Sequence, residues 1–238
     1  MLAAVCGKGR MGSLIASELE EKGWQTVTGD ALDPALFTEN VDSIDLVIDF
    51  SHPNNLAFLI DLFKGRPIPF VLGTTGYTPE QKDQIAKEAK TRPVFFASNY
   101  SLGVACMHVL VAQAAQILKN WDIEIIETHH NQKADAPSGT ALSLLETLDP
   151  DGDYAHVFGR EGKPGARQKE IGIHAVRGGT VAGEHDVRFF GNQEEIEIVH
   201  KAQDRQIFVH GAVQAAEFMK DKPAGLYAMN DLITGEKK

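Results

Sequence analysis

The first part of the chain alternates short apolar segments with segments of helical character. Strand-like runs rich in β-branched and aromatic residues occur at residues 2–6, 24–28, 45–51, 69–75 and 93–98. Helical patterns lie between most of these runs, at residues 10–23, 54–64 and 79–90. Nearly continuous apolar character is typical of strands that helices cover on both faces. The alternation therefore predicts an α/β domain with a parallel, doubly wound sheet.

The pattern changes after a further helix predicted at residues 103–119. Polar and apolar residues alternate in four later segments, at residues 121–130, 169–179, 180–191 and 194–203. Such alternation is typical of strands that face water or a partner on one side. Because these strands follow one another without helices, we expect a second, α+β domain whose sheet is mixed or antiparallel.

The remaining segments predict helices and one long loop. Residues 149–168 are rich in glycine, proline and charged side chains, which predicts a mobile loop. Residues 141–148 and 207–223 are each expected to form a helix, and residues 225–233 follow the second of them.

Composition and charge narrow the classes of partner. The 238 residues are 43% hydrophobic and 24% charged, as is typical of globular proteins with one large or two modest domains. A formal net charge of -10 argues against binding nucleic acid or an anionic membrane, because both attract an excess of Lys and Arg. The sequence shows neither an apolar run of about 18 residues nor a secretory leader. We therefore expect a cytoplasmic protein that binds small ligands.

Neither a disulfide framework nor a metal site is indicated. Cys6 and Cys106 lie beside apolar residues, so we expect both to be buried, reduced thiols. On a strand, the adjacent His129 and His130 would point to opposite faces and could not easily chelate one metal ion. No cluster of Cys or carboxylate residues supplies further ligands at zinc spacing, so no bound metal is expected.

The stretch CGKGRMG, residues 6–12, follows the first predicted strand and opens the first predicted helix. Gly7, Gly9 and Gly12 match Gly-x-Gly-x-x-Gly, in which glycines permit a tight turn and the helix N-terminus binds a pyrophosphate. Lys8 and Arg10 place cations where phosphates would lie. A glycine-rich turn without a ligand, with solvated surface cations, is the alternative interpretation. In this context the motif predicts a dinucleotide site.

Three further loops follow predicted strands, where open α/β sheets bind ligands. Asp30 comes after the second strand and is expected either to bind a ribose or to cap a turn, so the sequence does not distinguish NADH from NADPH. The loops GTTG, Gly73 to Gly76, and SNYSLG, Ser98 to Gly103, are small and polar. Either could be an ordinary turn, but together with the first motif they favour a nicotinamide cofactor.

The stretch ETHHNQKADAPSGTA, residues 127–141, concentrates titratable groups in the second domain. His129 and His130 are followed by Lys133 on the next turn. Ser138 is expected to be the N-cap of the helix that follows, and the free backbone amides there would bind a carboxylate. A role for Ser138 as a cap alone stays open. Beside a dinucleotide domain, this set suggests a reductase that takes hydride from the cofactor and a proton from the protein.

The same stretch resembles the signature of the dihydrodipicolinate reductase family. The resemblance extends to residues 9–12, 49–53, 73–76, 98–104, 171–185 and 225–233. It implies a Rossmann-like N-terminal domain to which the end of the chain returns, and a substrate domain whose sheet builds a homotetramer. On this basis we expect a dinucleotide-binding domain at residues 1–102 and 210–238 and a substrate-binding domain at residues 103–209.

The resemblance also implies roles for individual residues. His129 corresponds to the acid/base and Lys133 to a proton donor, while His130, Gly139 and Thr140 correspond to ligands of a small cyclic dicarboxylate. NADPH or NADH is the implied cofactor. Its contacts correspond to Gly7, Lys8, Gly9, Arg10, Met11, Gly73, Thr74, Thr75, Ser98, Asn99, Tyr100 and Ser101.

Two rival functions are weighed against this one. A different Rossmann reductase, of the homoserine or aspartate-semialdehyde type, would lack the compact His-His-Lys and Ser-Gly-Thr set. A non-catalytic redox or metabolite sensor would need a partner surface or an appended module. Arg177 is interpreted as part of the fold and subunit architecture rather than as a direct substrate contact.

Overall fold

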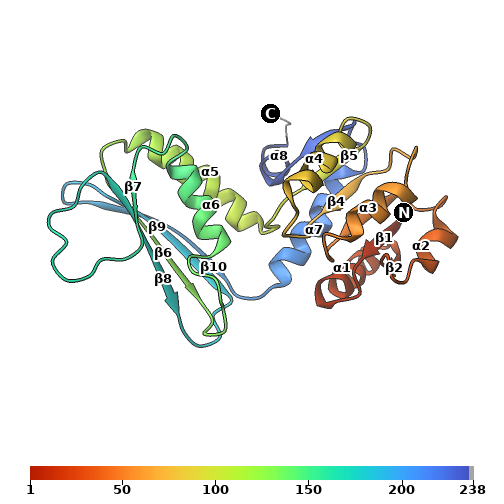
Figure 1. The fold of residues 1–238 in the computed structure, drawn as a ribbon, viewed down its shortest axis with the longest axis horizontal. Coiled ribbons are helices and arrows are strands. Elements are labelled where there is room, and N and C mark those ends of the chain that lie inside the picture. Colours follow the sequence, from red (N-terminus) through yellow and green to blue (C-terminus); the bar gives the residue numbers. More distant parts are fainter. Residues whose placement is uncertain (236–238) are drawn as a thin grey trace. The chain divides into compact units, whose positions relative to one another are not determined.

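The computed structural model describes residues 1–235, which form two compact units (Figure 1). The first unit comprises Met1–Leu102 and the segment from Gln206 onward, and the second comprises Gly103–Arg205. The chain returns to the first unit where helix α7 begins, at Gln206 rather than at residue 210. None of the helices in the described part of the chain is long and apolar enough to span a membrane.

The first unit is built on a six-stranded sheet in the order β11-β5-β4-β3-β1-β2, and every neighbouring pair is parallel. The strands are β1 (Leu2–Cys6), β2 (Gln25–Gly29), β3 (Leu46–Asp49), β4 (Phe70–Leu72), β5 (Pro93–Phe96) and β11 (Gly225–Tyr227). The helices are α1 (Arg10–Glu21), α2 (Ala35–Asn40), α3 (Asn55–Leu62), α4 (Pro79–Glu88), α7 (Gln206–Met219) and α8 (Met229–Thr234). The predicted parallel α/β domain is confirmed.

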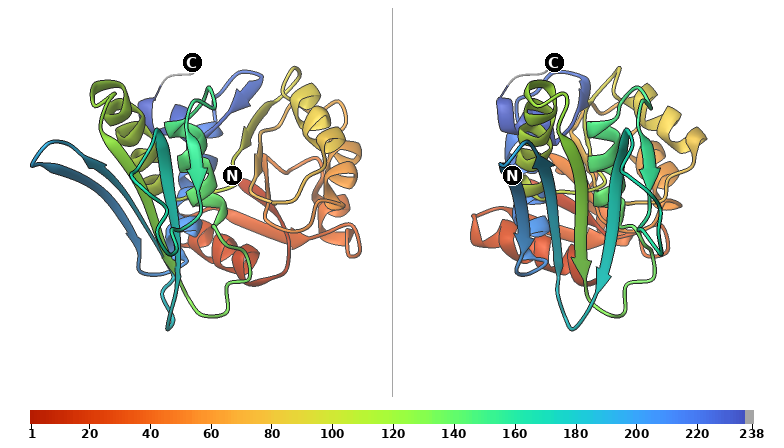
Figure 2. Two further views of the ribbon diagram at one scale, coloured as in Figure 1. Left: turned by 60° about the vertical axis from the view of Figure 1, so that its left-hand side comes forward. Right: turned by 90° about the vertical axis from the view of Figure 1, so that its left-hand side faces the viewer.

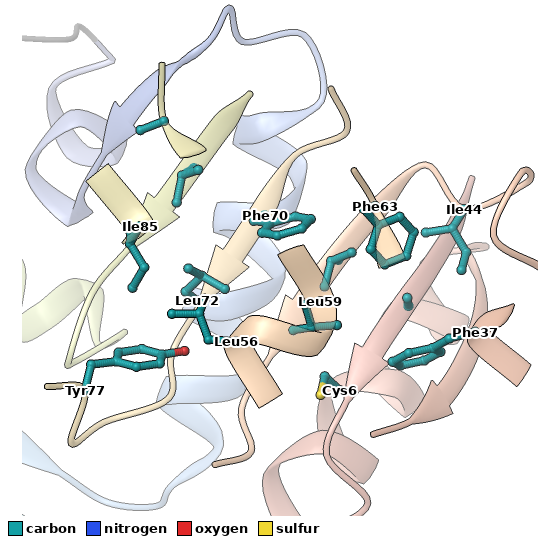
Figure 3. Packing of buried hydrophobic residues seen from close by; sticks show 14 residues of the cluster. Cys6, Phe37, Ile44, Leu56, Leu59, Phe63, Phe70, Leu72, Tyr77 and Ile85 are labelled. Atoms are coloured by element: carbon teal, nitrogen blue, oxygen red, sulfur yellow. The ribbon is translucent and has the colours of Figure 1, made fainter. Parts of the chain in front are cut away.

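One core cluster fills the space between this sheet and helices α2, α3 and α4 (Figure 3). All four residues of β3 are buried, as expected for a strand with helices on both faces. Phe37, Phe63 and Phe70 are at most 1% exposed, and the rings of Phe63 and Phe70 meet edge to face at 6.0 Å between centroids. Continuous apolar runs in the sequence thus correspond to strands buried on two sides.

The strand order changes direction beside β1. From β1 the chain first adds β2 on one side, and then adds β3, β4 and β5 in turn on the other. Because all these strands are parallel, the loops that follow them emerge at one edge of the sheet. In such sheets the crevice at the change of direction binds the ligand. The loops after β1, β2, β3 and β4 therefore define the ligand-binding edge of this unit.

The second unit contains a mixed five-stranded sheet in the order β10-β9-β6-β8-β7 (Figure 2). Its elements are α5 (Leu102–Ile117), β6 (Asp122–His129), α6 (Gly139–Leu148), β7 (Ala155–Val157), β8 (Glu170–Arg177), β9 (Gly183–Phe190) and β10 (Glu195–Ala202). β9 is antiparallel to β6 and β10, whereas β6, β8 and β7 run parallel. Helices α5 and α6 pack on one face, where their apolar residues share a core with those of β6, β8 and β9.

The expectation that the strands of this sheet follow one another without helices is wrong at one place. Helix α6 lies between β6 and β8 in the sequence, and these two strands pair in parallel. A parallel pair needs a crossover connection, since its strands run in the same direction. The helix predicted at residues 141–148 supplies this crossover.

The segment predicted as a loop at residues 149–168 is partly ordered by pairing. It contains β7, which pairs with β8, and its arginines are anchored on the sheet. Arg160 forms ion pairs with Glu124 and Glu170, each at 2.7 Å. Arg167 donates to the backbone oxygens of Ile123 and Glu170. The sequence did not predict these contacts. Hydrogen bonds from arginine side chains order a segment without producing a periodic pattern of apolar residues, and the glycine and proline content indicated a loop.

The two cysteines differ from each other in exposure. Cys6 is buried as predicted, and burial together with the Asp49 carboxylate raises the pKa of its thiol to about 12. Cys106 is exposed, which corrects the prediction that both thiols are buried. Helix α5 buries Val104, Met107 and Val111, a stripe at helical spacing that Cys106 does not join.

Candidate active site

The first glycine-rich loop has the backbone geometry of a ligand-binding turn. Gly7 has a φ of +112°, and a Cβ at this position would lie 2.8 Å from the carbonyl oxygen of Phe50. A Cβ at Gly12 would overlap the carbonyl oxygen of Gly7, so helix α1 approaches the loop closely. Gly9 is the N-cap of α1 and carries no capping side chain, which leaves the first amides of the helix available to an anion.

These glycines predict a difference in stability between two matched variants. Gly12→Ala is expected to lower the free energy of unfolding by about 1–3 kcal/mol, because the added methyl group displaces the loop backbone. Gly9→Ala is the control, since a Cβ at Gly9 meets no atom within 4 Å. Denaturant unfolding of both variants without ligand measures the difference. Equal stabilities of the two variants would contradict the close approach of α1 and the loop.

Two of the charged residues near this loop, Lys8 and Asp30, already have protein partners. Lys8 forms an ion pair with Asp33, and Arg10, the first residue of α1, is exposed. Asp30 directly follows β2, and its Oδ1 accepts hydrogen bonds from the backbone amides of Leu32 at 2.8 Å and Asp33 at 3.0 Å. Of the two roles expected for Asp30, the turn cap is present in the structure. Met11 lies partly buried in the first turn of the same helix.

The loop after β4 packs against the residues that follow β3. A Cβ at Gly73 would overlap the ring of Phe50, so a side chain could not be accommodated there. The Thr74 hydroxyl is buried and accepts a hydrogen bond from the amide of Ser51 at 2.8 Å. Thr75 is exposed. Of the three predicted cofactor contacts in this loop, Thr75 presents a side chain to solvent.

The loop after β5 holds Ser98 exposed and Tyr100 buried. The amide of Ser101 donates to Asn99 Oδ1 at 2.8 Å, which fixes the turn. The ring of Tyr100 packs against Phe50, with centroids 4.9 Å apart. Any contact between Tyr100 and a ligand would therefore come from its backbone rather than from its ring.

A chain of largely part-buried hydrogen bonds connects three of these loops. Asn55 accepts from the amide of Ala31 at 3.1 Å and donates to Ser51 Oγ at 2.8 Å. Ser51 donates in turn to Asp49, which also accepts from the Tyr77 hydroxyl at 3.0 Å. Burial raises the pKa of Asp49, although the hydrogen bonds from Ser51 and Tyr77 oppose this. The loops after β2, β3 and β4 are thus held in one arrangement.

In the second unit, strand β6 ends at His129 and presents Glu127 on the same face, two residues earlier. His129 Nδ1 forms a hydrogen bond with Glu127 Oε2, and Glu127 is fully buried. Arg177 binds the carboxylate with both terminal nitrogens, at 2.8 and 2.9 Å. Burial would raise the pKa of Glu127, but the hydrogen bonds from Arg177 and His129 prevail and lower it.

A second imidazole packs next to His129. The rings of His129 and His185 meet edge to face, with centroids 5.2 Å apart. Burial, and then the imidazole of His129, lower the pKa of His185 to about 4, so this side chain is neutral at pH 7. His185 Nε2 lies 3.0 Å from Ser138 Oγ, which places β9 against the start of α6.

Helix α6 begins beside these groups. Ser138 is its N-cap as predicted, since Ser138 Oγ accepts from the amide of Ala141 at 3.2 Å. The Ser138 amide donates to Glu127 Oε1 at 3.1 Å. Gly139 is exposed and Thr140 is partly exposed in the first turn of the helix. This turn therefore combines a buried, fully bonded Ser138 with accessible residues suited to binding a carboxylate.

The turn between β6 and α6 carries the remaining predicted residues. Lys133 is partly buried, and its Nζ lies 2.8 Å from Asp135 Oδ1. The amide of Lys133 donates to the backbone oxygen of His130 at 3.2 Å, and the His130 side chain is partly exposed. The structure thus gathers all six residues predicted for the second unit around the end of β6 and the start of α6.

Three residues of this site were not predicted as functional: Glu127, Arg177 and His185. Glu127 could have been found, because its spacing of two from His129 places both side chains on one face of a strand. Arg177 and His185 come from β8 and β9, and only the strand register brings them here. In the described residues, no group of three His, Cys, Asp or Glu side chains could hold a metal ion.

Comparisons with known proteins agree over almost the entire chain. Residues 1–100 match the family described as "Dihydrodipicolinate reductase, N-terminus", and residues 103–233 match "Dihydrodipicolinate reductase, C-terminus". A 4-hydroxy-tetrahydrodipicolinate reductase of Alkaliphilus metalliredigens is 41% identical over 231 residues, covering 94% of this chain and 95% of that protein. The enzyme of the same name from Brachyspira hyodysenteriae is 40% identical, covering 98% and 100%.

A solved structure shares the fold. The dipicolinate-bound dihydrodipicolinate reductase from Paenisporosarcina sp. TG-14 has a TM-score of 0.77 and 23% sequence identity. The similarity covers 96% of this chain and 97% of that one. The combination of a parallel α/β unit with a second unit built on a mixed sheet therefore occurs in a known enzyme.

Proposed function

The chain belongs to the dihydrodipicolinate reductase family, and we propose that it reduces 4-hydroxy-tetrahydrodipicolinate with NADH or NADPH, the activity for which its relatives are named. The substrate, NAD(P)H and a proton would give tetrahydrodipicolinate, NAD(P)+ and water. This reaction belongs to the biosynthesis of lysine and diaminopimelate. The observation that carries the proposal is His129, bonded to a buried carboxylate beside Lys133 and the first turn of α6.

The residues of the first unit fit a nicotinamide dinucleotide. The turn at Gly7 and the uncapped start of α1 at Gly9 offer backbone amides to a pyrophosphate. Thr75 and Ser98 expose polar side chains at the same edge of the sheet, after β4 and β5. When bound, the cofactor supplies the hydride. We propose that this unit, including the segment from Gln206 onward, is the dinucleotide-binding domain.

The residues of the second unit supply the remaining chemistry. Lys133 is a cation for a carboxylate of the substrate and a second proton donor. His130 and the amides of Gly139 and Thr140 bind carboxylate oxygens, because a helix N-terminus favours negative charge. His129 moves a proton through Nε2, the ring nitrogen that Glu127 does not contact. One segment of the chain thus contains both the groups that bind the substrate carboxylates and the groups that transfer the proton.

A direct assay tests this function. Freshly prepared 4-hydroxy-tetrahydrodipicolinate is supplied with NADH and NADPH in parallel, and the absorbance of the reduced cofactor is followed. We expect substrate-dependent oxidation with at least one of the two cofactors. Homoserine and aspartate semialdehyde serve as control substrates with the matching cofactor form. Turnover of a control substrate alone would favour another Rossmann reductase, and binding without turnover of any substrate would favour a sensor.

We also propose that the second unit is the tetramerisation domain. Helices α5 and α6 cover only one face of its sheet within the described part of the unit. On the opposite face, Val176 and Val199 are 46% and 45% exposed. Half-exposed apolar side chains on an open sheet face suit a contact with a second copy. Light scattering tests this proposal, since a monomeric mass at micromolar concentration would contradict it.

A further inference from the structure

Glu127 lies behind the proposed acid/base, and we propose that it is a positioning residue that determines which ring nitrogen of His129 exchanges the proton. This inference rests on the proposed function of His129 and extends it to a side chain that solvent does not reach. Glu127 is 0% exposed, so its effect on the reaction must pass through its neighbours.

The hydrogen bond between Glu127 and His129 fixes the tautomer of the imidazole. The lowered pKa of Glu127 keeps its carboxylate ionised, and an ionised carboxylate can only accept hydrogen bonds. His129 Nδ1 must therefore carry a hydrogen and donate it to Glu127 Oε2. Nε2 is then left as the nitrogen that accepts a proton in one state and donates it in the other.

The surroundings of Nε2 agree with this assignment. A Cβ at Gly183 would lie 3.1 Å from Nε2, so the absence of a side chain there keeps the space beside this nitrogen open. The neighbouring His185 is neutral at pH 7 and directs its Nε2 toward Ser138 instead. Nε2 of His129 is thus positioned for a ligand rather than for a protein partner among the described residues.

The carboxylate itself is held by donors that cannot reverse their roles. Arg177 donates to both oxygens, and the Ser138 amide donates to Oε1. Arg177 also donates to the backbone oxygen of Asp135, at 2.7 Å, on the turn that carries Lys133. Glu127 therefore connects the acid/base, the turn with the second proton donor and the start of α6.

This arrangement predicts what an amide would do at residue 127. In Glu127→Gln, the amide oxygen is best placed at the Oε1 position, where the Ser138 amide and Arg177 Nη2 both donate. At the Oε2 position, Arg177 Nη1 is the one fixed donor besides His129, so an amide NH2 meets fewer clashes there. The NH2 group then faces His129 and donates to Nδ1. The imidazole must accept at Nδ1 and carry its hydrogen on Nε2, which is the wrong tautomer for accepting a proton there.

The test compares Glu127→Gln with Glu124→Gln in the full-length protein. Glu124 is the control because it lies on the same strand and is also bonded to arginine and histidine, namely Arg160 and His174. We expect Glu127→Gln to lower kcat by about 100-fold or more, with little change in the KM for the dicarboxylate. Glu124→Gln is expected to leave kcat unchanged. Nitrogen NMR of 15N-histidine protein, with His129→Ala for assignment, should show Nδ1–H in the wild type and Nε2–H in Glu127→Gln.

Two outcomes would overturn the proposal. One is wild-type kcat in a folded Glu127→Gln variant, and the other is an Nδ1–H tautomer in that variant. Glu127→Asp keeps an ionised acceptor, so it should retain Nδ1–H and recover part of the lost kcat. If Glu127→Gln does not fold, loss of Nδ1–H in Glu127→Asp would overturn the proposal instead. Failure of the proposed function is distinguishable, because the wild-type protein itself would then not turn over the dicarboxylate.

Discussion

Replacing His129 with alanine is expected to lower kcat by about 100- to 10,000-fold, the usual contribution of a positioned acid/base. In this imidazole, Nδ1 is bonded to Glu127 and Nε2 is the nitrogen left to exchange a proton with the substrate. The neighbouring imidazole of His185 cannot take over, since it is buried, neutral at pH 7 and bonded to Ser138. The dissociation constant for NAD(P)H should stay nearly unchanged, because the proposed cofactor contacts lie in the first unit.

His156→Ala provides the matched control for this experiment. His156 is in the same unit and is also paired with a carboxylate, with its Nε2 2.8 Å from Asp149 Oδ2. It lies on β7, outside the site, so its loss should leave kcat intact. Steady-state kinetics measures kcat, and a fluorescence titration with the cofactor measures its dissociation constant. Full turnover by a folded His129→Ala variant would remove His129 from the mechanism.

Replacing Lys133 with alanine is expected to affect both kcat and KM. The loss of a proton donor should lower kcat by about 100-fold or more. The KM for the dicarboxylate should rise as well, because the ammonium group is a cation for a substrate carboxylate. Asp135, now at 2.8 Å from Lys133 Nζ, would lose its partner, and its carboxylate would repel the substrate. Lys133 lowers the pKa of Asp135 through this hydrogen bond. Without it the carboxylate is still ionised at pH 7, because the ordinary pKa of an aspartate is about 3.9.

Lys169→Ala tests whether any lysine of the second unit would have the same effect. Lys169 is also paired with an aspartate, Asp153, at 3.4 Å, but its side chain is 59% exposed. Exposed ion pairs contribute little to stability, so this variant should match the wild type in both kcat and the KM for the dicarboxylate. Equal kinetics of Lys133→Ala and Lys169→Ala would contradict a role for Lys133.

The sequence predicted those parts of the fold that depend on long apolar or alternating patterns. The strands around residues 2–6 and 46–49 were predicted because helices bury them on both faces. Four short elements were not predicted: α2, β7, β11 and α8. Each depends on its neighbours rather than on its own pattern, as β11 shows by adding three residues beside β5. Short elements without a periodic pattern of their own therefore form because they pair or pack with distant parts of the chain.

The candidate site was predictable where its residues are adjacent in the sequence. His129, Lys133 and Ser138 lie in one short segment, and its motif identifies them together. Glu127 lies in the same segment, but its role depends on the register that brings Arg177 of β8 opposite His129. Long-range pairing of this kind has no signature in a single sequence.

Transfer of deuterium from the cofactor tests the central claim most directly. The claim is that hydride from the nicotinamide, together with a proton from the second unit, reduces the cyclic dicarboxylate. The wild-type enzyme is supplied with 4-hydroxy-tetrahydrodipicolinate and with NADH or NADPH that carries deuterium at both positions of nicotinamide C4, in ordinary water. The account predicts one carbon-bound deuterium in each product molecule, as measured by mass spectrometry. A reduced product without deuterium would contradict it.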